Sequence, residues 1–313
     1  MSTLLLIAGL ALLIVSGEIL VKGAVSTALR FRISPAVIGL TVVSLGTSAP
    51  ELLVSVQAAL HGHADIAIGN IIGSNIANLA LVLGVTVLIT PILLVRDTMR
   101  IDYPAMLVAT VLFIVMIWDL HLGVIEGSIF VLSLALFVAF MIYRSRKTGF
   151  SQSVSDIPSK SWAMHWAVLA VVAGCVGLVF GANWFLQGAE SIARNLGVSD
   201  HLIGVTLVAF GTSLPELVTS IVAAIRKQAD LLVGNLIGSN IFNILGVLGV
   251  TSIVKPIDVD PRVLSSDVWW MFGCALVLLP MMLLGKRFGR RKGAVLFLIY
   301  LAYIAFVILG EKQ

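Results

Sequence analysis

The sequence predicts an all-α membrane protein with ten transmembrane helices, arranged as two five-helix repeats of inverted topology. Three observations predict this fold. The chain is 59% hydrophobic and only 12% charged, with a mean hydropathy of +1.08. Its apolar residues fall into ten runs that short polar connections separate. A segment of the first half recurs 165 positions later in the second half.

The composition indicates the broad class. Globular domains carry about 25% charged residues, about twice the share in this chain, so the chain is expected to lie in a lipid bilayer. A helix of about 20 residues crosses the hydrocarbon core, which leaves no room for a sizeable extramembrane domain. The net charge of +4 comes from short connections, which favours membrane orientation over nucleic-acid binding. No feature of the sequence indicates an obligate protein partner.

Ten helices are expected at residues 3–22, 36–60, 66–93, 102–118, 122–143, 163–186, 202–225, 231–254, 266–285 and 293–310. The first run lacks a basic flank and a small-residue cleavage site, so we expect a membrane helix and not a signal peptide. The longest connection divides the chain into a first repeat (1–145), a linker (146–161) and a second repeat (162–313).

The basic residues lie mostly on one side of the expected membrane. Connections that follow the odd-numbered helices hold 16 Lys and Arg residues, whereas the opposite side holds four. Cytoplasmic loops are enriched in Lys and Arg. This bias predicts a cytoplasmic linker, both termini outside, and location in a cell (inner) membrane.

The internal repeat is strongest around two polar motifs. Residues 39–84 align with 204–249 without a gap, and 25 of 46 positions are identical. Five helices per repeat is an odd number, so the second repeat must enter the membrane upside down. Inverted repeats are typical of secondary transporters, whose sites lie at the repeat interface near the midplane.

Each repeat carries one carboxylate inside an apolar run, in Gly46-Thr-Ser-Ala-Pro-Glu51 and Gly211-Thr-Ser-Leu-Pro-Glu216. An ionisable residue at this depth is costly and indicates function. Glycine and proline beside it interrupt the helix and release backbone groups for ions. A pair of glutamates stays ionised when a divalent cation lies between them. We therefore expect Glu51 and Glu216 to bind a cation.

The neighbouring polar groups are oxygen donors, which suit Ca²⁺ or Na⁺. The duplicated set is Thr47, Thr212, Ser48, Ser213, Ser74, Ser239, Asn78 and Asn243. Four further asparagines, Asn70, Asn75, Asn235 and Asn240, are expected mainly to cap helix breaks. No His or Cys accompanies the motifs, which disfavours zinc, copper and iron, and no cofactor is indicated. Cys175 and Cys274 are expected to be packing residues.

The paired Gly-Thr-Ser-x-Pro-Glu and Gly-Ser-Asn-Ile-x-Asn motifs resemble the two alpha-repeats of the sodium/calcium exchanger family, within the cation/calcium antiporter superfamily. The resemblance covers essentially the whole chain. It implies the small prokaryotic form: ten helices in two inverted halves, ion sites on helices two, three, seven and eight, and first and sixth helices that slide as a gating bundle.

The resemblance also implies roles for matching residues. Glu51 and Glu216 would bind both ions, and Thr47 and Thr212 would bind Ca²⁺. The flanking Na⁺ sites would use Ser48, Ser213, Ser74 and Ser239, with the backbone carbonyls of Ser44 and Ala209. Asn78 and Asn243 would line the central position.

The implied activity is sodium/calcium antiport, in which an inward Na⁺ gradient drives Ca²⁺ export by alternating access. Proton/calcium members of the superfamily resemble Gly-Asn-x-x-Glu instead, and potassium-dependent members place an aspartate where Asn243 stands. Antiport of protons, or of another divalent cation, is the alternative on this scaffold, and a cation channel is a weaker one. The chain has no HExxH motif and no nucleophile–base pair, so an enzyme is not expected.

Overall fold

The computed structural model describes residues 2–93, 98–148, 162–196, 211–285 and 287–310. Its first half contains α1 (Ser2–Phe31), α2 (Pro35–Ile38), η1 (Gly39–Val43), α3 (Ser44–Thr47), α4 (Ala49–Leu60), α5 (Ala64–Ile76), η2 (Ala77–Val82), α6 (Leu83–Ile89), β1 (Ile92–Leu93), η3 (Thr98–Asp102), α7 (Tyr103–Met116), β2 (His121–Leu122) and α8 (Val124–Thr148). Segments labelled η are π-helical.

The second half contains α9 (Met164–Asn195), α12 (Leu214–Ile225), α13 (Ala229–Ile241), η5 (Phe242–Leu248), α14 (Gly249–Val254), β3 (Ile257–Asp258), η6 (Val263–Asp267), α15 (Val268–Leu283), β4 (Arg287–Phe288) and α16 (Arg290–Gly310). Residues 149–161 of the predicted linker lie outside the described residues, whereas its first three residues belong to the end of α8. Most of the first half of the predicted helix 202–225 also lies outside the described residues.

The predicted membrane character is confirmed. Eight described helices are long and apolar enough to cross a bilayer, and a bent pair, Pro35–Thr47 with Ala49–Leu60, makes a ninth. The shorter apolar helix α12 covers the second half of the predicted span 202–225. The described part of the chain is therefore a helical membrane protein with eight to nine spans.

Two expected helices differ from the structure. The first runs on from residue 22 to Phe31, because Ala24 and Ala28 continue its buried face. The third, expected at 66–93, ends earlier, because α5, η2 and α6 form one continuous span, Ala64–Ile89. The irregularity in this span is the π-helical turn that begins at Ala77.

The two halves repeat the same backbone at a spacing of 165 residues, which becomes 166 from β2 and β4 onward. The bounds of α4, α5, η2 and η3 recur at that spacing in α12, α13, η5 and η6 to within one residue. Even the unusual turns recur: Gly62 and Lys227 both have positive φ, as do Leu120 and Gly285. The sequence repeat is thus a repeat of local structure, including its π-helical segments.

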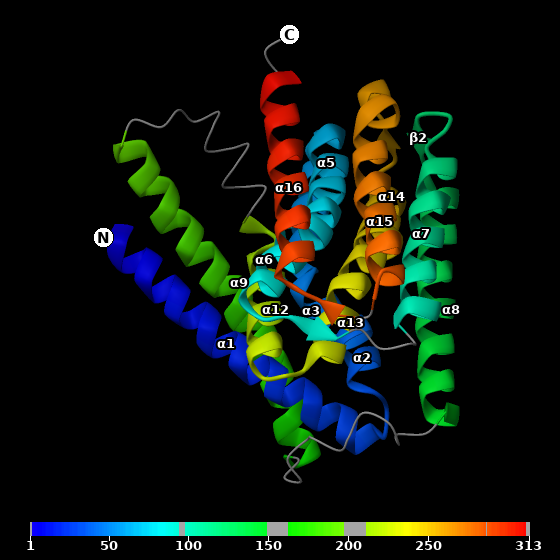
Figure 1. The fold of residues 1–313 in the computed structure, drawn as a ribbon. Helices are drawn as coiled ribbons and strands as arrows, with labels where there is room; N and C mark the ends of the chain where they lie inside the picture. Colours follow the sequence, from blue (N-terminus) through cyan, green and yellow to red (C-terminus); the bar gives the residue numbers. More distant parts are fainter. Residues whose placement is uncertain (1, 94–97, 149–161, 197–210, 286, 311–313) are drawn as a thin grey trace.

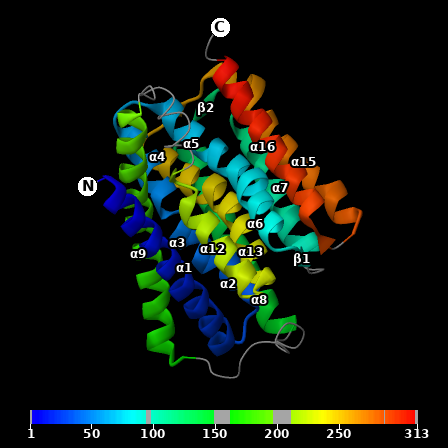
Figure 2. The same ribbon diagram turned by 60° about the vertical axis from the view of Figure 1, so that its left-hand side comes forward.

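Two short antiparallel strand pairs join the halves. Strand β1 pairs with β4, and β2 pairs with β3. Figure 2 shows β1 and β2 at opposite ends of the helices. The two pairs are equivalent by the internal repeat. Strand β1 of the first half corresponds to β3 of the second, and β2 corresponds to β4, so the β1–β4 pair corresponds to the β3–β2 pair. The pairing also agrees with the predicted sides, because connections after helices three and nine meet each other.

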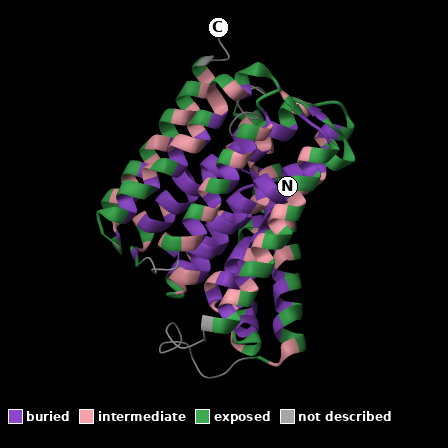
Figure 3. Ribbon diagram, turned by 90° about the vertical axis from the view of Figure 1, so that its right-hand side faces the viewer, coloured by how far each residue is buried: buried purple, intermediate pink, exposed green. Residues whose placement is uncertain are grey.

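Burial is concentrated in the centre of the helix layer. Within the span Ala229–Val254, 94% of the residues of an 18-residue apolar stretch are buried. The corresponding share in the span Arg290–Leu309 is 11%. Figure 3 shows the same contrast, with buried residues on the inner helices and exposed residues along the outer ones. The inner helices α4–α6 and α12–α14 carry both polar motifs, so these motifs lie where the protein is most shielded.

Helices α1 and α9 pack closely on each other and form a tilted pair at one side of the molecule (Figure 1). Glycines allow this approach. A Cβ atom at Gly181 would lie 2.9 Å from the backbone nitrogen of Leu13, and one at Gly23 would lie 2.9 Å from the carbonyl oxygen of Ala167. Small residues that let backbones approach are typical of helix interfaces in membranes.

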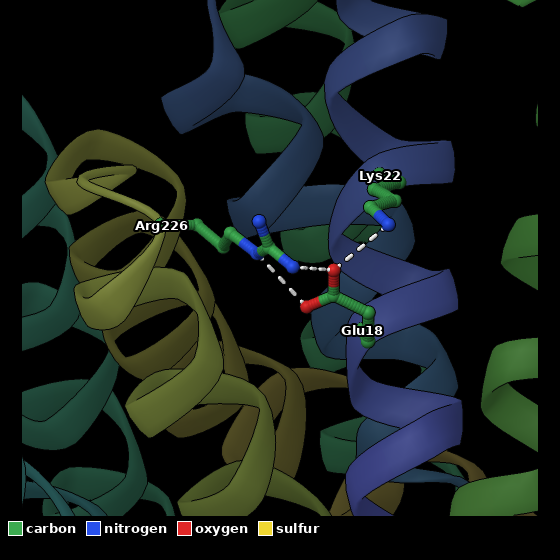
Figure 4. Close-up of polar contacts among 3 residues, drawn as sticks. All are labelled: Glu18, Lys22 and Arg226. Carbon is green, nitrogen blue, oxygen red and sulfur yellow. Dashed lines mark hydrogen bonds and ion pairs between the residues drawn. The ribbon is translucent and has the colours of Figure 1, made fainter.

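An ionic cluster connects this pair to the inner helices. Glu18 on α1 accepts hydrogen bonds from Arg226, at the end of α12, and forms an ion pair of 2.8 Å with Lys22. Figure 4 shows the Arg226 guanidinium against both carboxylate oxygens. A side chain on α1 is thus fixed to the helix that carries Glu216.

Candidate cation site

Each of the two Gly-Thr-Ser motifs contains a break between helical segments. Ser48, between α3 and α4, has φ −86° and ψ 7°, and the flanking helices are bent by 44°. Ser213 has nearly the same backbone, φ −85° and ψ 1°, directly before α12. The proline that follows each break lies in the first turn of the new helix, where its missing N–H costs nothing.

The breaks place both glutamates at helix N-termini inside the protein. Glu51 lies in the first turn of α4 and Glu216 in the first turn of α12, and both are fully buried. The positive end of a helix dipole stabilises a carboxylate at this position. Neither glutamate forms an ion pair with a Lys or Arg among the described residues. Any negative charge on the two glutamates is therefore not balanced by a basic side chain of the described residues.

Hydroxyl groups of one half meet those of the other across the site. The hydroxyls of Thr47 and Ser239 lie 3.4 Å apart, and those of Ser74 and Thr212 lie 3.3 Å apart. These two contacts are equivalent under exchange of the halves. The structure therefore brings together residues that are up to 192 positions apart in the chain.

Glu216 contacts hydroxyls from both halves. Its Oε1 accepts hydrogen bonds of 3.4 Å from Ser48 and from Ser239. Good O–H···O bonds measure about 2.7–2.8 Å, so these oxygens are gathered without being tightly bonded to one another. Oxygens at right angles around one Ca²⁺, each about 2.3–2.6 Å from the ion, would lie about 3.3–3.7 Å apart. The observed spacing matches that of calcium ligands.

Several buried polar atoms of the site have no hydrogen-bond partner among the described residues. They are both carboxylate oxygens of Glu51, Oε2 of Glu216, Oγ of Ser213, both amide atoms of Asn78 and Oδ1 of Asn243. Buried polar atoms are nearly always satisfied in proteins, and each exception calls for a cause such as an ion or water. These atoms, all but one oxygens, are the groups that could coordinate a cation.

The two central asparagines differ in their contacts. Asn243 donates a hydrogen bond of 3.1 Å to Oδ1 of Asn75, whereas Asn78 is fully buried without a partner in the described chain. Each lies one residue inside a π-helical turn. Ser44 is also fully buried, and its hydroxyl donates to the carbonyls of Gly39 and Asn235. Ala209 lies outside the described residues.

Asn70 and Asn235 belong to the network more directly than the sequence predicts. Oδ1 of Asn70 accepts from Thr212 at 3.5 Å, and Oδ1 of Asn235 accepts from Thr47 at 3.4 Å. Asn70 also donates to Ser55. Within the described residues these asparagines contact the motif threonines, and Asn70 also donates to the carbonyl of Glu51, beside the first break. Their duplication was the signal available in the sequence.

A cysteine of α9 touches the first break. A Cβ atom added at Gly46 would overlap Sγ of Cys175. Gly211, the equivalent glycine, is similarly covered by the side chain of Leu186 on α9. The expectation that Cys175 is a packing residue stands, and the structure specifies its partner: the glycine at the helix break.

Paired buried carboxylates, a duplicated set of oxygen donors and broken helices within a multi-span helical protein define a membrane carrier of hard cations. Comparison with known proteins makes the class specific. The family model described as sodium/calcium exchanger protein matches residues 1–143 and 166–309. The chain belongs to this family.

Individual relatives are similar over nearly their whole length. The putative antiporter CaxA of Alkalimonas amylolytica is 39% identical, and the alignment covers 96% of this chain and 97% of CaxA. The sodium/calcium exchanger MaX1 of Methanosarcina acetivorans is 33% identical, with 96% and 97% covered. Solved structures of the sodium-calcium exchanger NCX_Mj match with a TM-score of 0.83 at 32% identity, covering 97% of each chain.

The contact at Gly46 makes a testable prediction about stability. Gly46→Ala should lower the unfolding temperature in detergent, because the new methyl group overlaps Cys175, and such overpacking costs about 1–3 kcal/mol. Adding Cys175→Ala should restore most of the loss. Gly69→Ala is the matched control, since a Cβ there meets nothing within 4 Å. A Gly46→Ala protein as stable as the control would show that this contact is not tight.

Proposed function

We propose that the protein is a sodium/calcium antiporter, in which Na⁺ moving down its gradient drives Ca²⁺ export by alternating access. The observation that carries the proposal is the pair Glu51 and Glu216: two fully buried carboxylates, without a Lys or Arg partner among the described residues, within a duplicated set of oxygens. One Ca²⁺ neutralises the pair, and Na⁺ ions compete for the same oxygens. Such competition couples the two fluxes.

We assign the site residues by role. Glu51 and Glu216 bind both ions, and Thr47 and Thr212 provide oxygens for Ca²⁺. The serines Ser48, Ser213, Ser74 and Ser239 form flanking Na⁺ sites, with the carbonyls of Ser44 and Ala209. Asn78 and Asn243 line the centre. The unpartnered atoms of the site and its oxygen spacings near 3.4 Å support these assignments.

The same family resemblance favours sodium over protons as the coupling ion, and both motifs carry the Thr-Ser pair instead of a lone Asn. Hydroxyls are neutral ligands that suit Na⁺. Ca²⁺ takes six to eight oxygen ligands in either mechanism, so the motif resemblance, and not the presence of hydroxyls alone, favours sodium coupling.

We further propose ten helices in two inverted repeats, 1–145 and 162–313, joined by a cytoplasmic linker at 146–161. Two observations support this arrangement. Equivalent elements recur at a spacing of 165 residues, and the two strand pairs are equivalent by the same repeat. The basic bias of the odd-numbered connections supports an inner-membrane protein with both termini outside.

Orientation can be measured directly. A single cysteine at Lys147, in a variant that lacks the two native cysteines, should react with a membrane-impermeant reagent only from the cytoplasmic side. One at Gln313 should react only from outside. Reaction of both positions from the same side would rule out the ten-helix inverted arrangement.

Replacement of either glutamate tests the site itself. Glu51→Gln and Glu216→Gln keep the shape but each remove one charge, worth about 4 kcal/mol to a cation at 4 Å with an effective dielectric near 20. Each variant should fold yet lose Ca²⁺ uptake into Na⁺-loaded proteoliposomes. Wild-type uptake should require internal Na⁺, and internal K⁺ or an acidic interior should not replace it. Near-normal flux in either folded variant would falsify the two-carboxylate site.

The serines test ion selectivity. Ser48→Ala, Ser213→Ala, Ser74→Ala and Ser239→Ala should each weaken Na⁺ inhibition of Ca²⁺ binding by about 1–3 kcal/mol, by analogy with an unmade buried hydrogen bond. Ca²⁺ binding without Na⁺ should change less. Ser128→Ala is a control, because its hydroxyl bonds only its own helix on an exposed face. Equal losses for both ions would remove the serines from Na⁺ binding.

A further inference from the structure

A basic cavity of about 600 Å³ opens where β4 meets α16, far in sequence from both polar motifs. It is lined by Pro91, Arg287, Gly289, Arg290, Arg291 and Lys292. Four of these six residues are cationic. None of them belongs to the polar motifs, so this cavity is separate from the proposed transport site.

The repeat provides an internal comparison for this cavity. Strands β2 and β4 occupy equivalent places, so Gly123 corresponds to Gly289 and Glu126 to Lys292. Glycine packing confirms the correspondence: Gly127 lies against Gly249, and Gly293 lies against Gly84. The same strand–helix junction is thus built twice, with opposite charge.

The two junctions satisfy their helix N-termini differently. In α8, Oε2 of Glu126 accepts a hydrogen bond of 2.9 Å from the backbone N–H of Gly123, so the helix caps itself with an anion. In α16, the first turn holds no acidic residue and the equivalent position is Lys292. Cations at a helix N-terminus are unfavourable, because they add to its positive dipole. An anion from outside the chain would offset both the positive dipole at the start of α16 and the positive charge of Lys292.

The cationic side chains divide into two fixed and two available groups. Nε of Arg290 donates to the carbonyl of Leu88, and Nζ of Lys292 donates to the carbonyls of Met281 and Gly285. These bonds hold the two residues at the ends of neighbouring helices. The side chains of Arg287 and Arg291 are exposed and have no hydrogen bond or ion pair with another described residue. With no partner among the described residues, their guanidinium groups can bind phosphate bidentately.

The surroundings indicate a lipid as the source of the anion. Helix α16 begins at the cavity and continues as a span in which Val295, Leu298 and Leu301 are exposed. A phosphate held at the first turn would therefore have its acyl chains beside an apolar helix face. A cluster of at least four Lys and Arg residues at the end of a membrane helix favours net-negative lipids over zwitterionic ones.

We propose that this cavity binds the headgroup phosphate of an anionic phospholipid, with Arg287 and Arg291 as its side-chain ligands and the start of α16 as its backbone ligand. The phosphate takes the place that the Glu126 carboxylate occupies in the first repeat. The lipid thereby caps α16 and neutralises the cationic junction.

Native mass spectrometry of the purified full-length protein tests the proposal, with phosphatidylglycerol as the probe and phosphatidylcholine as its zwitterionic counterpart. The wild type should retain phosphatidylglycerol preferentially. The double variant Arg287→Gln, Arg291→Gln should lower its affinity by about tenfold, since two charge-assisted contacts are lost. The matched control Arg146→Gln, Lys147→Gln removes equal charge from exposed residues at the end of α8 and should bind as the wild type does.

Two further arms distinguish a lipid site from a site for free phosphate and from a folding defect. Arg287→Lys, Arg291→Lys keeps the charge but not the bidentate geometry, so it should bind more tightly than the Gln double variant and less tightly than the wild type. Its binding also shows whether the Gln double variant fails through misfolding. Inorganic phosphate, added at the same concentration as phosphatidylglycerol, should not displace the lipid. The proposal is overturned if the Gln double variant binds like the wild type, if the control loses as much affinity, if phosphatidylcholine binds equally, or if free phosphate displaces the lipid.

Discussion

The burial of two carboxylates in an apolar helix layer is the constraint on which the rest of this structure depends. A charge removed from water is expensive unless other groups and ions compensate for it. Glu51 and Glu216 receive the start of a helix each, and Glu216 also receives the hydroxyls of Ser48 and Ser239. The carboxylate oxygens that these partners leave without a hydrogen bond can be compensated by a transported cation.

The constraint explains why the helices that carry the two glutamates are broken. A straight α-helix has no free backbone groups at mid-membrane depth, so both motifs need a break, and both breaks have the same geometry at Ser48 and Ser213. The π-helical turns η2 and η5 begin within the Gly-Ser-Asn-Ile-x-Asn motif of each half and contain Asn78 and Asn243. Lipid-facing helices such as α16 have no such demand and are continuous.

The sequence predicts much of this because the repeat and the hydrophobic runs are local, one-dimensional signals. It identifies the family, the helical membrane class and, among the expected site residues, Ser48 and Ser239, whose hydroxyls contact Glu216. It misses features that depend on packing between distant segments. Asn70 contacts Thr212, and Gly46 contacts Cys175, and neither pairing leaves a periodic trace in the chain. The full length of α1 follows from its contact with α9, not from hydropathy alone.

The two strand pairs have a mechanical consequence. Each pair ties a connection of one half to a connection of the other, one at each end of the helices. A hinge motion that separated the two halves at one end would break the hydrogen bonds of the strand pair at that end. Neither strand pair involves α1 or α9. These two helices contact α12, and the ionic cluster at Glu18 adds to that contact. Movement of this two-helix unit relative to the inner helices would therefore leave both strand pairs intact.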